Sequence, residues 1–258
     1  MLVACLTHVG QKRYRRISQA MHAGIIACGD KAAIREMMLP KMEAHAAVMY
    51  GWKHVAALKC YPRYVYFDLG YWRRESFYRF SINGWSPPMK TGMPSSRFDS
   101  LGLEIKPWRT SGEEIIVAGS TAKACAEHGL AYQQWEREAI AKLQGMGKRV
   151  VYRPKPSDRL ATPIPGATLD RRPISEALDN CWGWVTHHSN SAVDALLAGI
   201  PVHCETGAAS HFSIPLESMA DPELLQGREQ FLYDVAWLQW TLEEMRSGEA
   251  WRHIRSML

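Results

Sequence analysis

Short apolar runs separated by polar residues fill the first part of the chain. Residues 1–6, 46–50 and 64–67 are apolar or aromatic runs of strand length, and a basic segment at 11–28 is predicted to be a helix. Runs of four to eight apolar residues are typical of buried strands, whereas apolar residues three or four apart are typical of helices. We therefore expect three strands and one long helix here.

From residue 113 onward, strand-like and helix-like segments alternate. Residues 115–118 form a strand, and Ser120 or Thr121 then caps a helix that runs to Leu143. The later segments are a strand at 149–153, a small helix at 174–178, a strand at 183–186, a buried helix at 192–198 and a strand at 201–204. Strands that alternate with helices predict a parallel sheet and an α/β fold.

Two stretches interrupt this alternation. The sequence between Trp72 and Trp108 is rich in Pro, Gly, Ser, Arg and aromatic residues, which predicts a long loop. The C-terminal segment predicts one long helix with a single apolar stripe, made by Phe231, Val235, Leu238, Leu242 and Met245. We expect a small N-terminal domain at 1–110 and a Rossmann-like domain at 111–258, whose last helix crosses back. A cleft between two domains is a favoured ligand site.

Composition indicates a globular protein that needs no disulfide to fold. The chain has 258 residues, 47% of them hydrophobic and 22% charged, which is enough for an ample core. Six cysteines at irregular spacing form no C-x-x-C pair, so we expect no zinc site, no disulfide framework and a reducing, cytoplasmic setting. We find no signal-peptide pattern and no apolar run near the roughly 20 residues that span a bilayer.

The net charge of +5 weakly favours a phosphorylated or polyanionic partner. The motifs G-x-x-x-x-G-K-[ST], G-x-G-x-x-G and G-x-S-x-G do not occur in the sequence. Their absence disfavours a P-loop NTPase, a typical dinucleotide dehydrogenase and an α/β hydrolase.

Residues 150–202 are the most informative stretch, because polar side chains follow two of its strands directly. Ligands of open α/β sheets bind outside the carboxyl ends of the strands, and cations and hydroxyls there suit a phosphate. We therefore predict that the following residues bind a phosphate-bearing ligand: Arg153, Lys155, His187, His188, Ser189 and Ser191. The alternatives are a solvated strand-to-loop junction, core histidines and simple helix capping.

Two residues of this stretch have competing interpretations. Ser191 and Asp194 have the S-x-x-D spacing of a capping box, but the Asp194 carboxylate would also suit sugar or ribose hydroxyls. His187 and His188 would need a third ligand to hold zinc, and no nearby His, Cys or Asp has suitable spacing. We therefore expect no metal, and hydrogen bonds from the histidines to phosphate or base.

Asp68 is the best candidate for a general base, since it follows the strand at 64–67 and precedes Gly70. A carboxylate at a strand end can take a proton from an attacking hydroxyl, although it can also simply form a turn. The neighbouring sequence mixes cations and aromatic rings, which suits a sugar, base or phosphate acceptor but is also typical of an exposed amphipathic loop. The predicted acceptor residues are Tyr71, Trp72, Arg73, Arg74 and Trp85.

Three segments resemble the GT-B glycosyltransferases, in particular the capsular polysaccharide Kdo-transferase and polysialyltransferase type. "VVYRPKP" resembles that family's "YRPHP", and "THHSNSAVDALLAGIPV" resembles its "S-x-x-x-x-E-A-L-L-x-G-K-P-V". "FDLGYWRRESFYRFSINGWS" resembles an "E-x-G-Y-x-R-P" segment followed by a "G-x-N" run. Lys155 stands where the family has His, and Asp194 where it often has Glu.

This resemblance implies two Rossmann-like domains with a cleft between them. The C-terminal domain would bind a nucleotide-sugar donor, with neither metal nor cofactor, and Asp68 would occupy the family's acidic position. Arg153 and Lys155 would face the donor phosphates, while His188 and Ser189 would line the donor site. The positive charge and the loop of aromatic and basic residues favour a hydroxyl on a polyanionic acceptor. We expect either an acidic glycan or DNA with a hydroxymethylated base, which compact phage enzymes of this fold modify.

Two other functions fit the same sequence. One is a nucleotide-sugar epimerase of GT-B layout, which needs no macromolecular acceptor. The other is a non-catalytic nucleotide- or nucleic-acid-binding protein, which the small N-terminal domain would favour.

Overall fold

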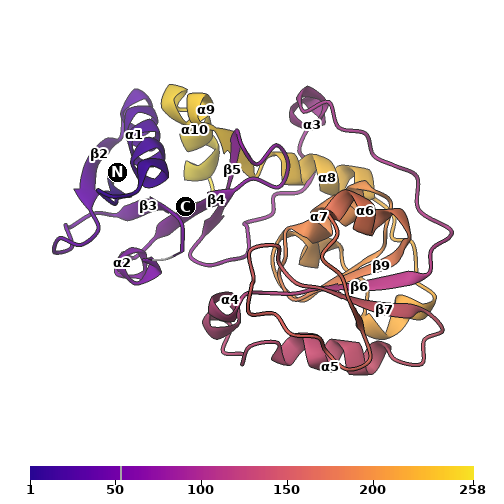
Figure 1. Cartoon of the computed structure of the whole chain (residues 1–258). Coiled ribbons are helices and arrows are strands. Elements are labelled where there is room, and N and C mark those ends of the chain that lie inside the picture. Colours follow the sequence, from indigo (N-terminus) through magenta and orange to yellow (C-terminus); the bar gives the residue numbers. More distant parts are fainter. Residues whose placement is uncertain (53) are drawn as a thin grey trace. The chain divides into compact units, whose positions relative to one another are not determined.

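The computed structural model describes residues 1–52 and 54–258, which form two compact units (Figure 1). Unit 1 contains residues 1–90 and 234–258, and unit 2 contains residues 91–233. The chain thus leaves unit 1 at Lys90, earlier than the expected boundary near 110, and returns to it at Asp234. The return has a structural cause, because a strand after Asp234 completes the sheet of unit 1.

Unit 1 is built on a six-stranded sheet with the order β11-β5-β4-β3-β1-β2. Four of its strands are parallel: β1 (Leu2–Thr7), β2 (Lys31–Glu36), β3 (Ala46–Tyr50) and β4 (Tyr64–Leu69). Antiparallel pairs then add β5 (Phe77–Ile82) and β11 (Gln239–Thr241). The helices of this unit are α1 (Lys12–Ala27), α2 (Val55–Lys59), α9 (Leu242–Ser247) and α10 (Glu249–Arg255).

Helix α1 lies directly against α9, and Gly24 permits the close contact. A Cβ atom at Gly24 would stand 1.8 Å from the main-chain oxygen of Met245 in α9. On the same side of α1, Ile17, Met21 and Ile25 are buried. The contact therefore depends on a residue without a side chain.

Unit 2 is built on a five-stranded parallel sheet with the order β10-β9-β6-β7-β8. The strands are β6 (Glu114–Ala118), β7 (Arg149–Arg153), β8 (Thr168–Leu169), β9 (Cys181–Thr186) and β10 (Val202–Cys204). The α-helices are α3 (Ser96–Ser100), α4 (Ala122–Glu127), α5 (Gln134–Leu143), α6 (Ile174–Asp179), α7 (Ser191–Leu197) and α8 (Arg228–Ala236), the last of which ends in unit 1. Two 3₁₀ helices cover Ala208–Phe212 and Leu216–Ala220.

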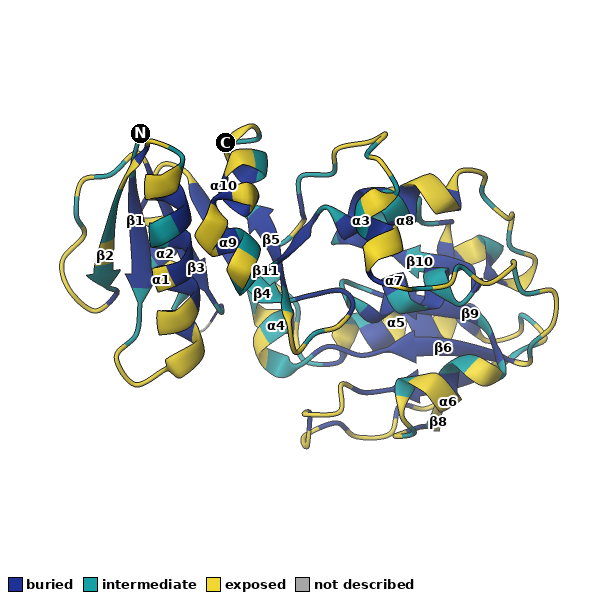
Figure 2. Cartoon of the chain, turned by 90° about the horizontal axis from the view of Figure 1, so that it is seen from above, coloured by how far each residue is buried: buried dark blue, intermediate teal, exposed yellow. Residues whose placement is uncertain are grey.

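The strand order of unit 2 is that of a Rossmann-type half. Counted along the chain from β6, the strands lie in the order 3-2-1-4-5, with the first strand in the centre. Ile115, Ile116 and Val117 of β6 are completely buried, so apolar residues cover both faces of this strand. Figure 2 shows the central strands buried while the helices keep an exposed side.

Most predicted strands and the first helix are confirmed, and two helix predictions are wrong. The helix expected from Thr121 to Leu143 is two helices, because the chain turns at Gly129 and Gln133, both with φ near the left-handed region (71° and 59°). The single C-terminal helix is instead α8, β11, α9 and α10, since Gln239–Thr241 pairs with β5. The expected loop after Trp72 contains β5 and α3.

Among the described residues, no helix combines the length and apolar character that a membrane crossing requires.

Candidate functional site

The carboxyl ends of β6 and β9 form the point in unit 2 where the strand order reverses. The chain leaves β6 toward β7 on one side and leaves β9 toward β10 on the other, while Ala118 pairs with Thr186 between them. In open α/β sheets such a switch point is where ligands bind. We call this place the switch-point site; it consists of the loop at 187–190, which follows Thr186, and the residues that follow Ala118.

Thr186 fixes the geometry of this site. Its buried hydroxyl donates to the carbonyl oxygen of Ala118 at 2.9 Å and accepts from the main-chain N–H of Ser189 at 3.2 Å. One side chain therefore joins the ends of the two central strands and also sets the start of the loop at 187–190. A rigid loop is what a binding site needs to hold a ligand in one geometry.

Three histidines gather at this loop. Nδ1 of His187 lies 3.0 Å from Nδ1 of His188, and the ring of His128 lies 4.6 Å from the centre of each of their rings. His128 is the C-cap residue of α4, the helix that follows β6. His128 was not predicted as a site residue, because it is far from His187 along the chain. The signal was available, however, since α4 begins at the neighbouring strand end.

Burial keeps the imidazoles of His187 and His128 uncharged at neutral pH. Burial and, to a smaller extent, the neighbouring His128 together lower the pKa of His187 to about 4, against the opposing effect of Glu205. Burial also lowers the pKa of His128. Neutral imidazoles offer a lone pair to a ligand, whereas protonated ones only donate.

The serines of the loop are only partly available. Ser191 is buried, and its Oγ accepts from Nε1 of Trp184 at 3.2 Å and lies 2.7 Å from Oγ of Ser189. Ser189 is half-buried and so is the more accessible of the two. The predicted capping box is wrong, because Ser191 is the first residue of α7 and its N-cap, Asn190, makes no side-chain cap. Asp194 lies half-buried in the first turn.

Arg153 and Lys155, the two cationic residues predicted to bind phosphate, differ in how far they are buried. Arg153 is buried, and its Nη2 donates to the main-chain oxygen of Arg172 at 3.2 Å. The charge of Arg153 also acts on Asp170. Burial raises the pKa of this carboxyl group, but hydrogen bonds from Arg172 and the charge of Arg153 outweigh the effect of burial, so the pKa is lowered overall. Lys155, two residues on, is exposed. The structure therefore ties Arg153 to the protein interior and leaves Lys155 open to solvent.

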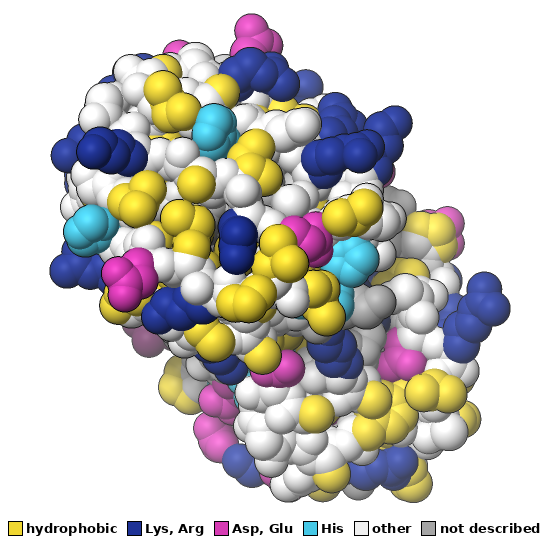
Figure 3. Space-filling view, turned by 90° about the vertical axis from the view of Figure 1, so that its left-hand side faces the viewer, with side chains coloured by type: hydrophobic (Ala, Val, Ile, Leu, Met, Phe, Trp, Pro, Cys, Tyr) yellow, Lys and Arg dark blue, Asp and Glu magenta, His cyan; other side chains and the backbone are white. Residues whose placement is uncertain are grey.

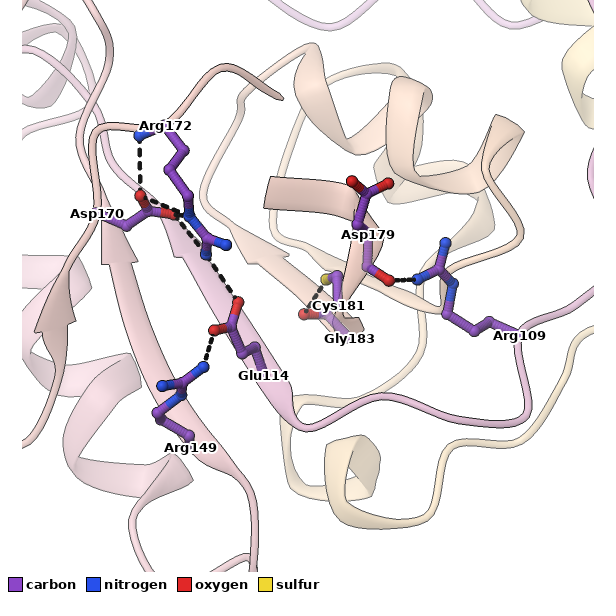
Figure 4. Close-up of polar contacts among 8 residues, drawn as sticks. All are labelled: Arg109, Glu114, Arg149, Asp170, Arg172, Asp179, Cys181 and Gly183. Atoms are coloured by element: carbon purple, nitrogen blue, oxygen red, sulfur yellow. Dashed lines mark hydrogen bonds and ion pairs between the residues drawn. The ribbon is translucent and has the colours of Figure 1, made fainter. Parts of the chain in front are cut away.

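A second polar cluster lies at the opposite end of β6. The carboxylate of Glu114, only 3% exposed, accepts from Arg149 and, at 2.9 Å, from Arg172, which also pairs with Asp170 (Figure 4). These residues line a pocket of about 240 Å³ together with Val151, Thr168 and Leu169. Two arginines and two carboxylates cancel each other's charge. This balance of charges does not favour an anion. The ion pairs instead join β6, β7 and the segment after β8.

Asp68 belongs to unit 1 and lies inside β4, one residue before its end. It accepts from the Tyr66 hydroxyl at 2.7 Å and from the N–H of Leu69 at 2.8 Å. Nη2 of the buried Arg79, its partner on β5, stands 3.7 Å from the same carboxylate, which is 35% exposed. Asp68 was expected just after the strand, but β4 extends through Leu69.

Tyr50 and Arg13 adjoin Asp68 at the carboxyl edge of the unit 1 sheet. Tyr50 ends β3, and its hydroxyl accepts from Nη1 of Arg13 at 3.1 Å. Burial raises the pKa of Tyr50, and the negative charge of Asp68 raises it further. Sequence analysis missed both residues. Tyr50 could have been predicted near Asp68, because it stands at the end of a strand parallel to β4.

The predicted acceptor residues divide into core and surface. Tyr71 and Trp72 are 1% and 4% exposed, and their N–H groups donate to Oε1 of Gln239 at 2.7 and 3.1 Å, so they lie in the core of unit 1. Trp85 is half-buried against Trp52, with ring centres 3.9 Å apart. Arg73 is exposed and Arg74 half-exposed. On the face in Figure 3, Lys and Arg side chains lie scattered among acidic and apolar ones.

No protein-family model matches the chain, and no curated protein sequence matches it. Solved structures do. The KpsC beta Kdo 2,7 transferase of Thermosulfurimonas dismutans superposes with a TM-score of 0.56 at 13% identity over 98% of both chains. The KpsC beta Kdo 2,4 transferase of the same organism gives a TM-score of 0.54 at 13% identity over 93% of this chain and 92% of that one.

The chain therefore has the fold of a GT-B glycosyltransferase, as its sequence segments predicted. Within that class, its fold is similar to that of the KpsC Kdo transferases over nearly the whole length of both chains.

Proposed function

We propose that this protein is a glycosyltransferase that moves a sugar from a nucleotide-sugar donor to a hydroxyl acceptor. The observation that carries the proposal is the switch-point site, where His187, His188 and Ser189 follow the strand next to the centre of a Rossmann-type sheet. The fold of unit 2 and the likeness to sugar transferases support the same assignment. Fold alone does not define an activity, so the proposal rests on the site.

The donor would bind through its phosphates and its ribose. The loop of His187, His188 and Ser189 would hold the phosphate oxygens, and Asp194 in the first turn of α7 would accept from a ribose or sugar hydroxyl. Lys155 would reach the phosphates from the surface. Arg153 would act from the interior, by holding the segment at 170–172 in place.

The chemical step would be a single displacement with Asp68 as the base. Its carboxylate would take the proton of the acceptor hydroxyl while that oxygen attacks the anomeric carbon of the donor. The bond from this carbon to the phosphate oxygen would break, and the nucleotide would leave with the electron pair. The partly exposed carboxylate of Asp68, fixed by Tyr66 and Arg79, supports this role.

An acidic glycan is the acceptor that we favour. The two KpsC structures carry Kdo transferase in their names, and Kdo is an acidic sugar. The positive net charge and the exposed Arg73 suit an anionic acceptor. DNA with hydroxymethylated bases is the alternative, and its use would show as strong inhibition by salt.

The proposal is tested by measuring nucleotide release from a donor in the presence of acceptor glycans or DNA. We expect Asp68→Asn to lower the rate by about 100-fold or more while leaving donor binding intact, because only proton removal is lost. Glu75→Gln, an exposed acidic position of the same unit, is the matched control and should keep full activity.

Other outcomes separate the remaining functions. A donor that is converted without any acceptor would identify an epimerase. A donor that is bound but never consumed would identify a binding protein. Equal rates for Asp68→Asn and the wild type would remove Asp68 from the mechanism.

A further inference from the structure

We infer that His128, His187 and His188 form a binding site for a divalent transition metal ion, and zinc is the ion they suit best. The three side chains come from two places in unit 2, the end of α4 and the loop after β9. One ring nitrogen of each lies within 4.8 Å of the others. This trio is called the histidine cluster below.

The spacing of two of the three nitrogens is close to that of a tetrahedral site. Zinc binds imidazole nitrogen at about 2.0–2.1 Å, so two such ligands stand about 3.3 Å apart. The Nδ1 atoms of His187 and His188 are 3.0 Å apart. The ring of His128 is stacked on that of His188, with centres 4.6 Å apart, and its ligand nitrogen lies within 4.8 Å of the other two.

The backbone around the histidine cluster is held in place, which favours a preformed site. The carbonyl oxygen of His187 accepts from the N–H of Thr206 at 2.8 Å. The hydroxyl of Thr186 fixes the N–H of Ser189 one residue after His188. A site whose ligands are already positioned loses little entropy when an ion binds.

The surroundings also suit a metal. Trp135 lies edge-on to the ring of His187, with centres 5.7 Å apart. Nε1 of Trp135 donates to Oε1 of Glu205 at 3.4 Å, and Nε2 of His203 lies 3.2 Å from the same oxygen. The carboxylate of Glu205 thus places a negative charge near the cluster, which favours a bound cation.

The donor set selects the kind of ion. Three imidazole nitrogens suit zinc, cobalt, nickel or copper, whereas magnesium and calcium prefer oxygen ligands. Three protein ligands leave a fourth position for water or for an anionic oxygen, which distinguishes such a site from closed, four-ligand structural zinc sites. No third ligand lies near His187 and His188 along the sequence, but in the fold His128 supplies one.

Metal binding to the whole protein, freed of metal by chelation, tests the inference without any assay of sugar transfer. We expect zinc to bind with one-to-one stoichiometry by titration calorimetry and to raise the unfolding midpoint. Cobalt should give the intense visible bands of a tetrahedral complex. Replacing any member of the cluster, as in His128→Ala, should weaken zinc binding about 100-fold or more.

His211→Ala is the matched control, because this exposed histidine of unit 2 lies outside the cluster and its removal should leave zinc affinity unchanged. Circular dichroism checks that each variant is folded, and the cobalt spectrum of the wild type gives a result that needs no variant. The inference is overturned if zinc binds the wild type no better than His128→Ala, or if cobalt gives only the pale spectrum of a six-coordinate ion. A protein that binds zinc but transfers no sugar would overturn the proposed function alone.

Discussion

Thr186 and its contacts illustrate how single residues set the switch-point site. The sequence predicted that His187, His188 and Ser189 follow a strand, because a β-branched and aromatic run ends just before them. It did not predict His128, since the proximity of two strand ends depends on sheet order and not on local pattern. It also did not predict that Arg153 is buried, with its Nη2 bonded to the main-chain oxygen of Arg172.

Replacing Thr186 with valine should destabilise the protein by about 1–3 kcal/mol, because the buried carbonyl of Ala118 and the N–H of Ser189 both lose a partner while the side-chain shape is kept. Urea denaturation measures this loss. Thr168→Val, on an exposed residue of β8, is the control and should change stability little. Equal stability of both variants would mean that Thr186 does not join the two strands.

Glu136 provides a test through pH. It is buried and accepts from the N–H of Ser120 at 2.7 Å, and burial raises its pKa above the ordinary 4.5 in spite of this bond. A raised folded-state pKa means that the stability present below pH 4.5 is lost as the pH rises through the folded-state value. Glu136→Gln cannot ionise and keeps the acceptor oxygen.

The unfolding midpoint of Glu136→Gln relative to wild type should therefore increase between about pH 4.5 and pH 7.5. Thermal unfolding at a series of pH values measures this difference. A constant difference across the range would contradict a raised pKa.

At the scale of elements, local pattern succeeded where an element is complete in itself. The strand at 149–153 was predicted to the residue, because five apolar and basic residues lie between a glycine-rich turn and a proline. Strands β5 and β11 were missed for the opposite reason. They pair with each other across a long stretch of chain, and Gln239 is buried by that pairing although it is polar.

The contact of α1 with α9 can be tested at Gly24. Gly24→Ala should lower the free energy of unfolding by about 2 kcal/mol, because the clash with the main chain of Met245 outweighs the better helix propensity of alanine. Gln19→Ala, an exposed position of the same helix, is the control and should be neutral or slightly stabilising. A stable Gly24→Ala protein would show that the two helices do not lie this close.

At the scale of the whole molecule, the sequence predicted an α/β fold of GT-B type, and the structure and its neighbours confirm that fold. The alternation of strands and helices was sufficient for unit 2. Which segments of the chain form unit 1 could not be predicted in this way, because its sheet is completed by a strand from the C-terminal segment. Such a return is decided by which edges need covering, and that is a property of the folded chain.

The central claim is that the switch-point site binds a nucleotide sugar, and a thermal-shift screen with CMP-, UDP-, GDP- and ADP-sugars tests it most directly. A ligand that binds only the native state raises the unfolding midpoint. We predict that one nucleotide class will stabilise the wild type and the Asp68→Asn variant equally, and will stabilise His188→Ala markedly less. A screen in which no nucleotide sugar shifts the midpoint of the wild type would contradict the claim.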